Sequence, residues 1–148
     1  MTEPTLVQQL AALAARPPAD LPDAVRSSAQ QRVLDILGIC VRAATLDTSA
    51  AATRFAVAQG GRPDASAIGV TTRLPAPAAA FVNGVLAHSL DYDDTHLPSI
   101  LHPSASVVPA TLAAAQAAGT DGATTIAAAA VGIEIAVRLG MAGYDREA

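Results

Sequence analysis

The titratable side chains of this sequence gather in one short window, residues 83–103. The window holds every histidine of the chain and three of its thirteen acidic residues, and these six residues are His88, His96, His102, Asp91, Asp93 and Asp94. Imidazoles and carboxylates transfer protons, and they also bind divalent metals such as Zn, Mn or Fe. The window therefore predicts a site that works by acid–base chemistry or by metal binding.

Helical spacing suggests how an acid–base site would be arranged. If the preceding helix continues through the window, His88 and Asp91 lie three residues apart on one face, with Thr95 four residues beyond Asp91. On this template Asp94 joins the side of His88 less closely, and Asp93 points away. Three carboxylates within four residues repel one another, which favours a protonated or shared-proton state of one of them. A nearby histidine would then complete an acid–base pair.

The segment 102–104, His-Pro-Ser, adds a second element to the window, because it places an imidazole at the start of a predicted helix. The first N–H groups of a helix are unpaired and its dipole favours anions, so a substrate carboxylate is expected to dock beside His102. This combination suits proton abstraction next to a carboxylate, followed by elimination or decarboxylation.

Two other interpretations of the window remain open. Acidic residues and threonine ahead of a proline-containing loop are typical of helix caps and Asx turns, so Asp93, Asp94 and Thr95 are compatible with a structural role. A metal site is the second interpretation. The spacing contains no His-Glu-x-x-His signature, and Asp-Tyr-Asp-Asp only loosely resembles the aspartate-rich motifs that bind Mg-diphosphate.

Hydrophobic periodicity predicts that helices position this window. The expected helices span residues 5–16, 21–44, 47–59, 77–90, 103–118 and 123–142. Residues 91–101 are expected to form a loop, and residues 65–70 a short extended stretch too brief to define a sheet. The last helix is apolar nearly all round, so we expect it to be buried on most sides. The predicted fold class is all-α, with about six helices in a single domain over residues 1–148.

Three smaller features have structural interpretations. Cys40 is the only cysteine and lies among apolar residues, which favours a packed core thiol over a reactive one. Glu134 and Arg138 have the spacing and order of an intrahelical ion pair. Gly132 and Gly140 in the same helix indicate positions of close helix packing.

The composition excludes several classes of protein. The net charge is −4 and the nine basic residues are scattered arginines, which argues against a nucleic-acid partner. A single cysteine forms neither a disulfide framework nor a thiolate metal cluster. The N-terminus lacks a basic segment ahead of an apolar run, and the longest apolar run, residues 126–133, is well short of a membrane span. We therefore expect a cytoplasmic protein that neither binds nor crosses a membrane.

The sequence resembles the MmgE/PrpD family in two neighbouring motifs. The first, residues 76–96, is Ala-Pro-Ala-Ala-Ala-Phe-Val-Asn-Gly-Val-Leu-Ala-His-Ser-Leu-Asp-Tyr-Asp-Asp-Thr-His, and the second, residues 102–110, is His-Pro-Ser-Ala-Ser-Val-Val-Pro-Ala. Segments 32–38 and 131–140 resemble an early and a later helix of the family, so the likeness covers essentially the whole chain. The family includes 2-methylcitrate dehydratase, cis-aconitate decarboxylase and an iminodisuccinate epimerase.

The resemblance implies a lyase or isomerase without cofactor or metal, acting on small di- or tricarboxylates such as 2-methylcitrate or cis-aconitate. It implies that Asp91 and His102 are the acid–base residues. Thr95 would contact the substrate through its hydroxyl group, with His88 and Asp94 as supporting substrate-binding residues. The choice between dehydration, decarboxylation and epimerisation stays open.

The chain differs from the family pattern in its length. Family members are much longer, usually form homodimers, and take a second histidine, lysines and a lid domain from downstream segments. We therefore expect this chain to be the N-terminal part of the helical domain without the lid, carrying half of an active site that a second copy or a complementing C-terminal polypeptide completes. The alternatives are a non-catalytic fragment that assembles with a full-length relative and, less consistent with the resemblance, a metal-dependent hydrolase.

Overall fold

The computed structural model describes residues 3–15 and 18–144, and over these ranges it contains helices but no strand. The six α-helices are α1 (Leu6–Ala14), α2 (Asp23–Ala43), α3 (Asp47–Gln59), α4 (Ala76–His88), α5 (Pro103–Ala118) and α6 (Gly122–Tyr144), and two short 3₁₀ turns are η1 (Pro18–Asp20) and η2 (Leu97–Ser99). The predicted all-α class and the six helices are confirmed. The predicted end of the first helix, Arg16, lies outside the described residues.

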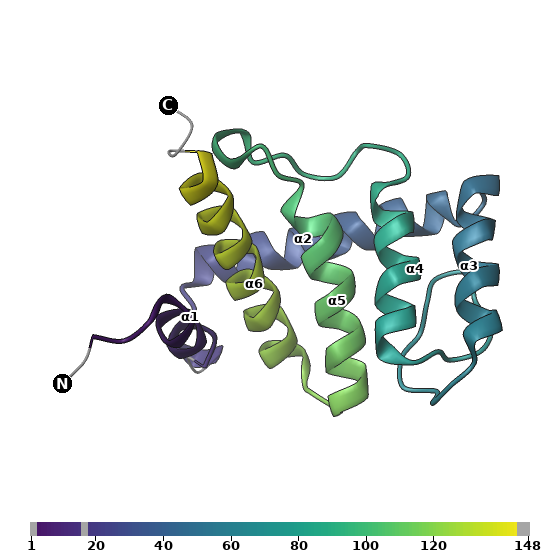
Figure 1. The fold of residues 1–148 in the computed structure, drawn as a ribbon, viewed down its shortest axis with the longest axis horizontal. Helices are drawn as coiled ribbons and strands as arrows, with labels where there is room; N and C mark the ends of the chain where they lie inside the picture. The colour runs from purple at the N-terminus through teal and green to yellow at the C-terminus, as the bar shows by residue number, and fades with distance from the viewer. Residues whose placement is uncertain (1–2, 16–17, 145–148) are drawn as a thin grey trace.

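Helices α4, α5 and α6 lie side by side in one layer, and α2 crosses behind all three (Figure 1). Helix α3 packs against α4 at one end of this layer, and α1 packs against α6 at the other. The connection between α4 and α5, residues 89–102, runs along one edge of the layer. The titratable window therefore lies where α4 ends and α5 begins, beside α2.

The core forms where the apolar face of α2 meets α4 and α5. Ile36 of α2, Val82 and Leu86 of α4, and Val108 of α5 are almost completely buried. Many of the other buried residues are alanines, which allow the helices to approach closely. This packing fixes the C-terminal end of α4 relative to the N-terminal end of α5.

Cys40 lies in this core, as predicted. Its Sγ–H donates a hydrogen bond to the backbone oxygen of Asn83, with 3.4 Å between the two atoms. Burial raises the pKa of the thiol from 9.0 to about 11. The thiol therefore stays protonated at neutral pH and contributes to packing.

Helix α6 approaches its neighbours closely at its two predicted glycine positions. A Cβ atom added to Gly132 would lie 2.7 Å from Cγ1 of Val107 in α5, and one added to Gly140 would lie 2.6 Å from Cδ1 of Leu101. Close packing at both glycines is confirmed.

Asp121 caps helix α6 by accepting a hydrogen bond from the Thr124 N–H at 2.7 Å, which holds the pKa of its carboxyl below the usual value.

The expectation that α6 is buried on most sides is wrong. Ala127, Ala129, Ala130 and Val137 are buried, whereas Leu139 is half exposed. Although α6 contacts α1, α2 and α5, a side that carries Ala128, Glu134 and Leu139 remains exposed. By length and composition α6 would also suffice to cross a membrane, as core helices of soluble proteins often would. The Glu134–Arg138 ion pair is present on the exposed side, with 2.6 Å between Nε and Oε1.

Candidate active site

The site begins where helix α4 ends. The hydroxyl group of Ser89 donates a hydrogen bond to the backbone oxygen of Val85 at 2.5 Å and so competes with the next helical turn. Asp91 then adopts a left-handed conformation with φ of 54°, which aspartate tolerates better than most residues. This residue turns the chain out of the helix. The directions of the following side chains therefore differ from those of a continued helix.

Asp94 ties the connection to two helices. Its carboxylate accepts hydrogen bonds from the backbone N–H of Ser104 at 3.0 Å and from the Ser104 hydroxyl at 2.8 Å, and it forms an ion pair with Arg32 of α2. Ser104 belongs to the first turn of α5, whose N-cap residue, His102, makes no side-chain cap. Asp94 thus supplies the anion at this helix end, where the sequence predicted a substrate carboxylate.

The segment from His96 to Leu101 forms the second anchor. The backbone N–H of His96 donates to the oxygen of Leu101 at 2.9 Å, and the loop closes through a left-handed Ile100 with φ of 50°. Ser99 is buried beside Gly140 of α6, and its hydroxyl lies 2.8 Å from Nδ1 of His96. His96 is therefore bound within this loop rather than grouped with the other two histidines.

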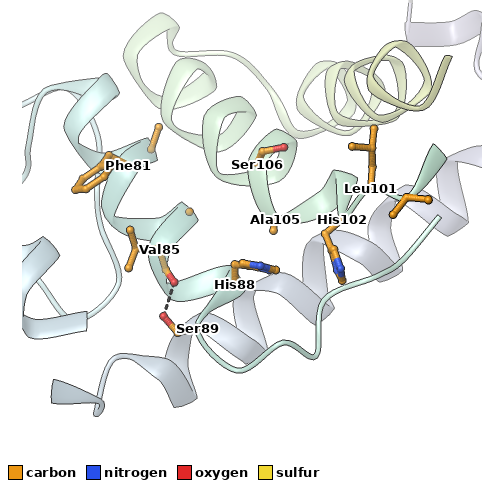
Figure 2. A pocket seen from close by; sticks show the side chains of 11 residues that line it. Phe81, Val85, His88, Ser89, Leu101, His102, Ala105 and Ser106 are labelled. Carbon is orange, nitrogen blue, oxygen red and sulfur yellow. Dashed lines mark hydrogen bonds between the residues drawn. The ribbon is translucent and has the colours of Figure 1, made fainter. Parts of the chain in front are cut away.

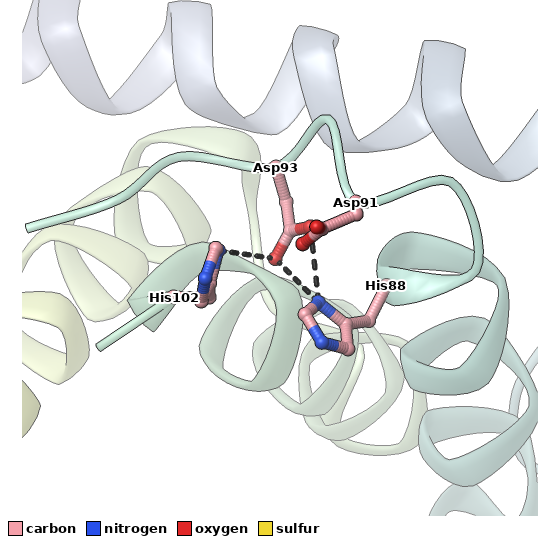
Figure 3. Close-up of side chains that lie close together, drawn as sticks. All are labelled: His88, Asp91, Asp93 and His102. Carbon is pink, nitrogen blue, oxygen red and sulfur yellow. Dashed lines mark hydrogen bonds and ion pairs between the residues drawn. The ribbon is translucent and has the colours of Figure 1, made fainter. Parts of the chain in front are cut away.

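Together these anchors place Asp93 between two imidazoles (Figure 3). The Asp93 side chain is 0% exposed, and each of its oxygens lies 3.1 Å from Nδ1 of His88. Nδ1 of His102 lies 3.4 Å from Asp93 Oδ2, without the angles of a hydrogen bond. The expectation that Asp93 points away is wrong, because it assumed a helix through position 91.

Both histidines line an open pocket of about 870 Å³ between α4 and α5 (Figure 2). The other lining residues are Ala80, Phe81, Gly84, Val85, Ser89, Ile100, Leu101, Ala105 and Ser106. Apolar walls with a few polar groups and a volume of this size are typical of small-molecule sites. The two imidazoles are the only ionisable side chains among the lining residues.

The tautomer of each imidazole determines what it can do in this pocket. A neutral ring that donates its Nδ1–H to Asp93 keeps a free lone pair on Nε2, on the opposite side of the ring. That lone pair can accept a proton from a molecule in the pocket. The buried carboxylate then stabilises the resulting imidazolium, as in other carboxylate–histidine pairs. The geometry is therefore suited to general acid–base chemistry.

Of two other predicted site residues, Asp91 lies near the pocket histidines and Thr95 does not line the pocket. Asp91 is exposed, yet its carboxylate approaches that of Asp93 (Figure 3), so it lies near His88 and His102 without the continued helix that the prediction assumed. Its role as an acid–base residue stays a prediction. Thr95 is exposed next to Asp94 and does not line the pocket. Asp93 is the residue that sequence reasoning missed. The available signal was Ser89 followed by an acidic cluster, a pattern that favours a helix end over a continued helix.

The same group could hold a metal ion. His88, Asp91, Asp93 and His102 each offer one nitrogen or oxygen atom, and these four atoms lie within 4.8 Å of one another. Two imidazole nitrogens and two carboxylate oxygens are ligands that Zn²⁺ accepts. Geometry alone is compatible with both a proton-transfer site and a metal site.

The fold and the site together describe an all-helical domain that holds two histidines and a buried carboxylate beside an apolar pocket. Comparison with known families shows that residues 8–147 match the MmgE/PrpD N-terminal domain. The chain belongs to the MmgE/PrpD family, and the resemblance found in the sequence is confirmed.

Two relatives are cis-aconitate decarboxylases. The chain is 35% identical over 124 residues to the cis-aconitate decarboxylase of Homo sapiens, an alignment that covers 80% of this chain and 26% of that protein. It is 43% identical over 83 residues to the cis-aconitate decarboxylase of Mus musculus, covering 53% of this chain and 15% of that protein. The chain therefore spans about a quarter or less of the length of these curated relatives. The comparisons support a lyase-type role for the family to which this chain belongs.

Proposed function

We propose that this chain forms one wall of the active site of a lyase that acts on small di- or tricarboxylates, such as cis-aconitate or 2-methylcitrate, by acid–base chemistry. The observation that carries the proposal is the fully buried carboxylate of Asp93 between the imidazoles of His88 and His102, both of which line the pocket. The likeness to two cis-aconitate decarboxylases supports this substrate class.

The two imidazoles would divide the proton transfers between them. In a dehydration, one ring accepts the proton from the carbon next to a carboxylate, and the other donates a proton to the departing hydroxide. In a decarboxylation, the carbon–carbon bond to a carboxylate breaks, CO₂ leaves, and an imidazolium donates its proton to the carbanion. Asp93 does not react in either case. It orients the rings and stabilises the imidazolium while it lasts.

We propose a second wall because the residues that line the pocket include no lysine or arginine to bind a substrate's carboxylates. A di- or tricarboxylate carries two or three negative charges, and binding them requires cationic groups with good geometry. None of the pocket-lining residues is a lysine or an arginine, and the arginine that contacts the neighbouring Asp94, Arg32, is already paired with it. We propose that a complementing C-terminal polypeptide, or a second copy of the chain, supplies these cations in the cytoplasm.

A reconstitution assay tests this proposal. The chain is assayed alone and together with the C-terminal remainder of a cis-aconitate decarboxylase, and CO₂ release from cis-aconitate and water loss from 2-methylcitrate are measured. We expect turnover only in the mixture, and we expect His102→Ala and His88→Ala each to reduce it, because each removes one of the two imidazoles that line the pocket. Robust turnover by the chain alone would contradict the need for a second wall. Full turnover by a mixture that contains His102→Ala would instead favour the alternative of a non-catalytic assembly fragment.

A further inference from the structure

We propose that His88, Asp91, Asp93 and His102 bind one divalent transition-metal ion, best matched by Zn²⁺, through the two Nδ1 atoms and one oxygen of each carboxylate. The proposal concerns metal binding by this chain and does not depend on the lyase reaction. A bound metal ion would compete with the acid–base chemistry of the same side chains.

The distances from the Asp93 carboxylate to the two imidazole nitrogens fit the ion. In a tetrahedral Zn²⁺ site with bonds near 2.0–2.1 Å, neighbouring ligand atoms are about 3.3 Å apart. The carboxylate of Asp93 lies 3.1 Å from Nδ1 of His88 and 3.4 Å from Nδ1 of His102. The exposed Asp91 side chain supplies the fourth atom, within 4.8 Å of the others. The two distances from Asp93 thus match those of a tetrahedral site, and all four ligand atoms lie within 4.8 Å of one another.

Nδ1 of His102 gives an independent reason to expect a cation. This atom is buried and makes no hydrogen bond within the part of the chain that the structure describes. Buried polar atoms are rarely left without a partner, because losing hydration without compensation is costly. Nδ1 lies 3.4 Å from Oδ2 of Asp93 without making a hydrogen bond, so a metal ion held among these side chains would give it a partner (Figure 3).

The charges of the group also favour a divalent ion. Asp91 and Asp93 bring two carboxylates together, and like charges at this range repel. The arginine side chains that form ion pairs within residues 3–15 and 18–144 contact Asp94, Asp64 and Glu134 instead. Two carboxylates and two neutral imidazoles sum to −2, which a divalent cation neutralises. The backbone of Asp91 is left-handed, an uncommon conformation outside glycine.

Metal binding would have a consequence for the proposed lyase, and this consequence alone rests on the proposed function. A ring bound to metal through Nδ1 carries its proton on Nε2. With both rings in this state, neither Nε2 can accept a proton from a molecule in the pocket. Zn²⁺ would therefore inhibit the reaction rather than support it.

Calorimetric titration of the untagged full chain with ZnCl₂ tests the binding. We expect one ion per chain. Asp93→Asn and His102→Gln should each weaken the affinity by about tenfold or more, because each removes a ligand. The matched controls are His96→Gln, which changes a histidine held by Ser99, and Asp35→Asn, which changes an exposed acid of α2. Both controls should retain the wild-type affinity.

Two spectroscopic readouts need no variant and so do not depend on whether the variants fold. Co²⁺ added in place of Zn²⁺ should give the visible absorption of a tetrahedral site. In ¹⁵N spectra, Zn²⁺ should shift the Nδ1 resonances of His88 and His102 and leave those of His96 unchanged. The absence of saturable binding of one equivalent, or a loss of affinity in His96→Gln as large as in His102→Gln, would overturn the proposal. Either result would leave the outcome of the cis-aconitate assay unaffected, so the two proposals fail separately.

Discussion

The imidazole rings of His88 and His102 meet edge to face, with their centroids 5.1 Å apart and an interplanar angle of 61°. The two residues come from the end of α4 and the start of α5, and they share the buried carboxylate of Asp93 between them. Because one carboxylate lies within 3.4 Å of both rings, Asp93 can stabilise a positive charge on either of them. This arrangement is the structural basis of the proposed chemistry.

Asp94 is expected to stabilise the fold. Asp94→Ala removes the cap of α5 and leaves Arg32 without its partner, so we expect the free energy of unfolding to fall by about 1–3 kcal/mol. Urea denaturation followed by circular dichroism measures this change. Asp35→Ala, an exposed acid on α2, should change stability by no more than about 0.5 kcal/mol. Equal effects of the two substitutions would contradict the anchoring role of Asp94.

Two glycines are expected to respond to alanine with opposite signs. In Gly132→Ala the new Cβ meets Cγ1 of Val107 at 2.7 Å, and because a β-branched side chain is stiff, we expect a loss of about 1–3 kcal/mol. Gly38→Ala lies in helix α2 with no atom within 4 Å of the new Cβ, so its higher helix propensity should stabilise the protein by about 0.5–1 kcal/mol. Thermal or urea unfolding compares the two variants. Stabilisation by both would show that α5 and α6 do not pack as described.

Cys40 gives a prediction for alkaline pH. Its pKa is raised to about 11 in the folded protein, from 9.0. The stability that this shift represents is fully present below pH 9 and is lost as the pH rises through about 11, because the unfolded thiol ionises first. Urea unfolding at pH 8 and pH 10 should show a larger decrease for the wild type than for Cys40→Ala. The same decrease in stability in both proteins would show that ionisation of the Cys40 thiol does not cause it.

Burial of Cys40 also predicts slow alkylation. Iodoacetamide reacts with the thiolate, so the native protein at pH 8 should react much more slowly than the protein in urea. Mass spectrometry of timed samples measures both rates. Native alkylation as fast as that in urea would contradict the packing of α2 against α4.

The helices could be predicted from the sequence because their signals are local. The apolar positions of α2 repeat at helical spacing, and Pro103 and Gly119 mark the two ends of α5, so the bounds follow from periodicity and from capping residues. The site window could be found because its residue types are concentrated there. Both predictions depend only on residues close together in the chain.

The arrangement within the window could not be predicted, because distant contacts determine it. The direction of Asp93 depends on one left-handed residue, Asp91, and on Arg32 of α2 holding the neighbouring Asp94. His96 and His88 are chemically identical, yet only His88 meets His102, because Ser99 holds His96 in the loop beside α6. The exposed face of α6 was missed for the same reason, since periodicity indicates which residues are apolar but not which helices will cover them.

The most direct test of the account is Asp93→Asn in the reconstituted enzyme, with kcat/KM for CO₂ release from cis-aconitate as the measurement. Asparagine keeps the volume of Asp93 but removes the charge that orients and stabilises the two imidazoles, so we predict a decrease of about 10²–10⁴-fold. His96→Gln, whose side chain lies in the loop with Ser99, should retain the wild-type value. An Asp93→Asn chain with unchanged circular dichroism and wild-type kcat/KM would contradict the claim that Asp93, His88 and His102 form the acid–base group.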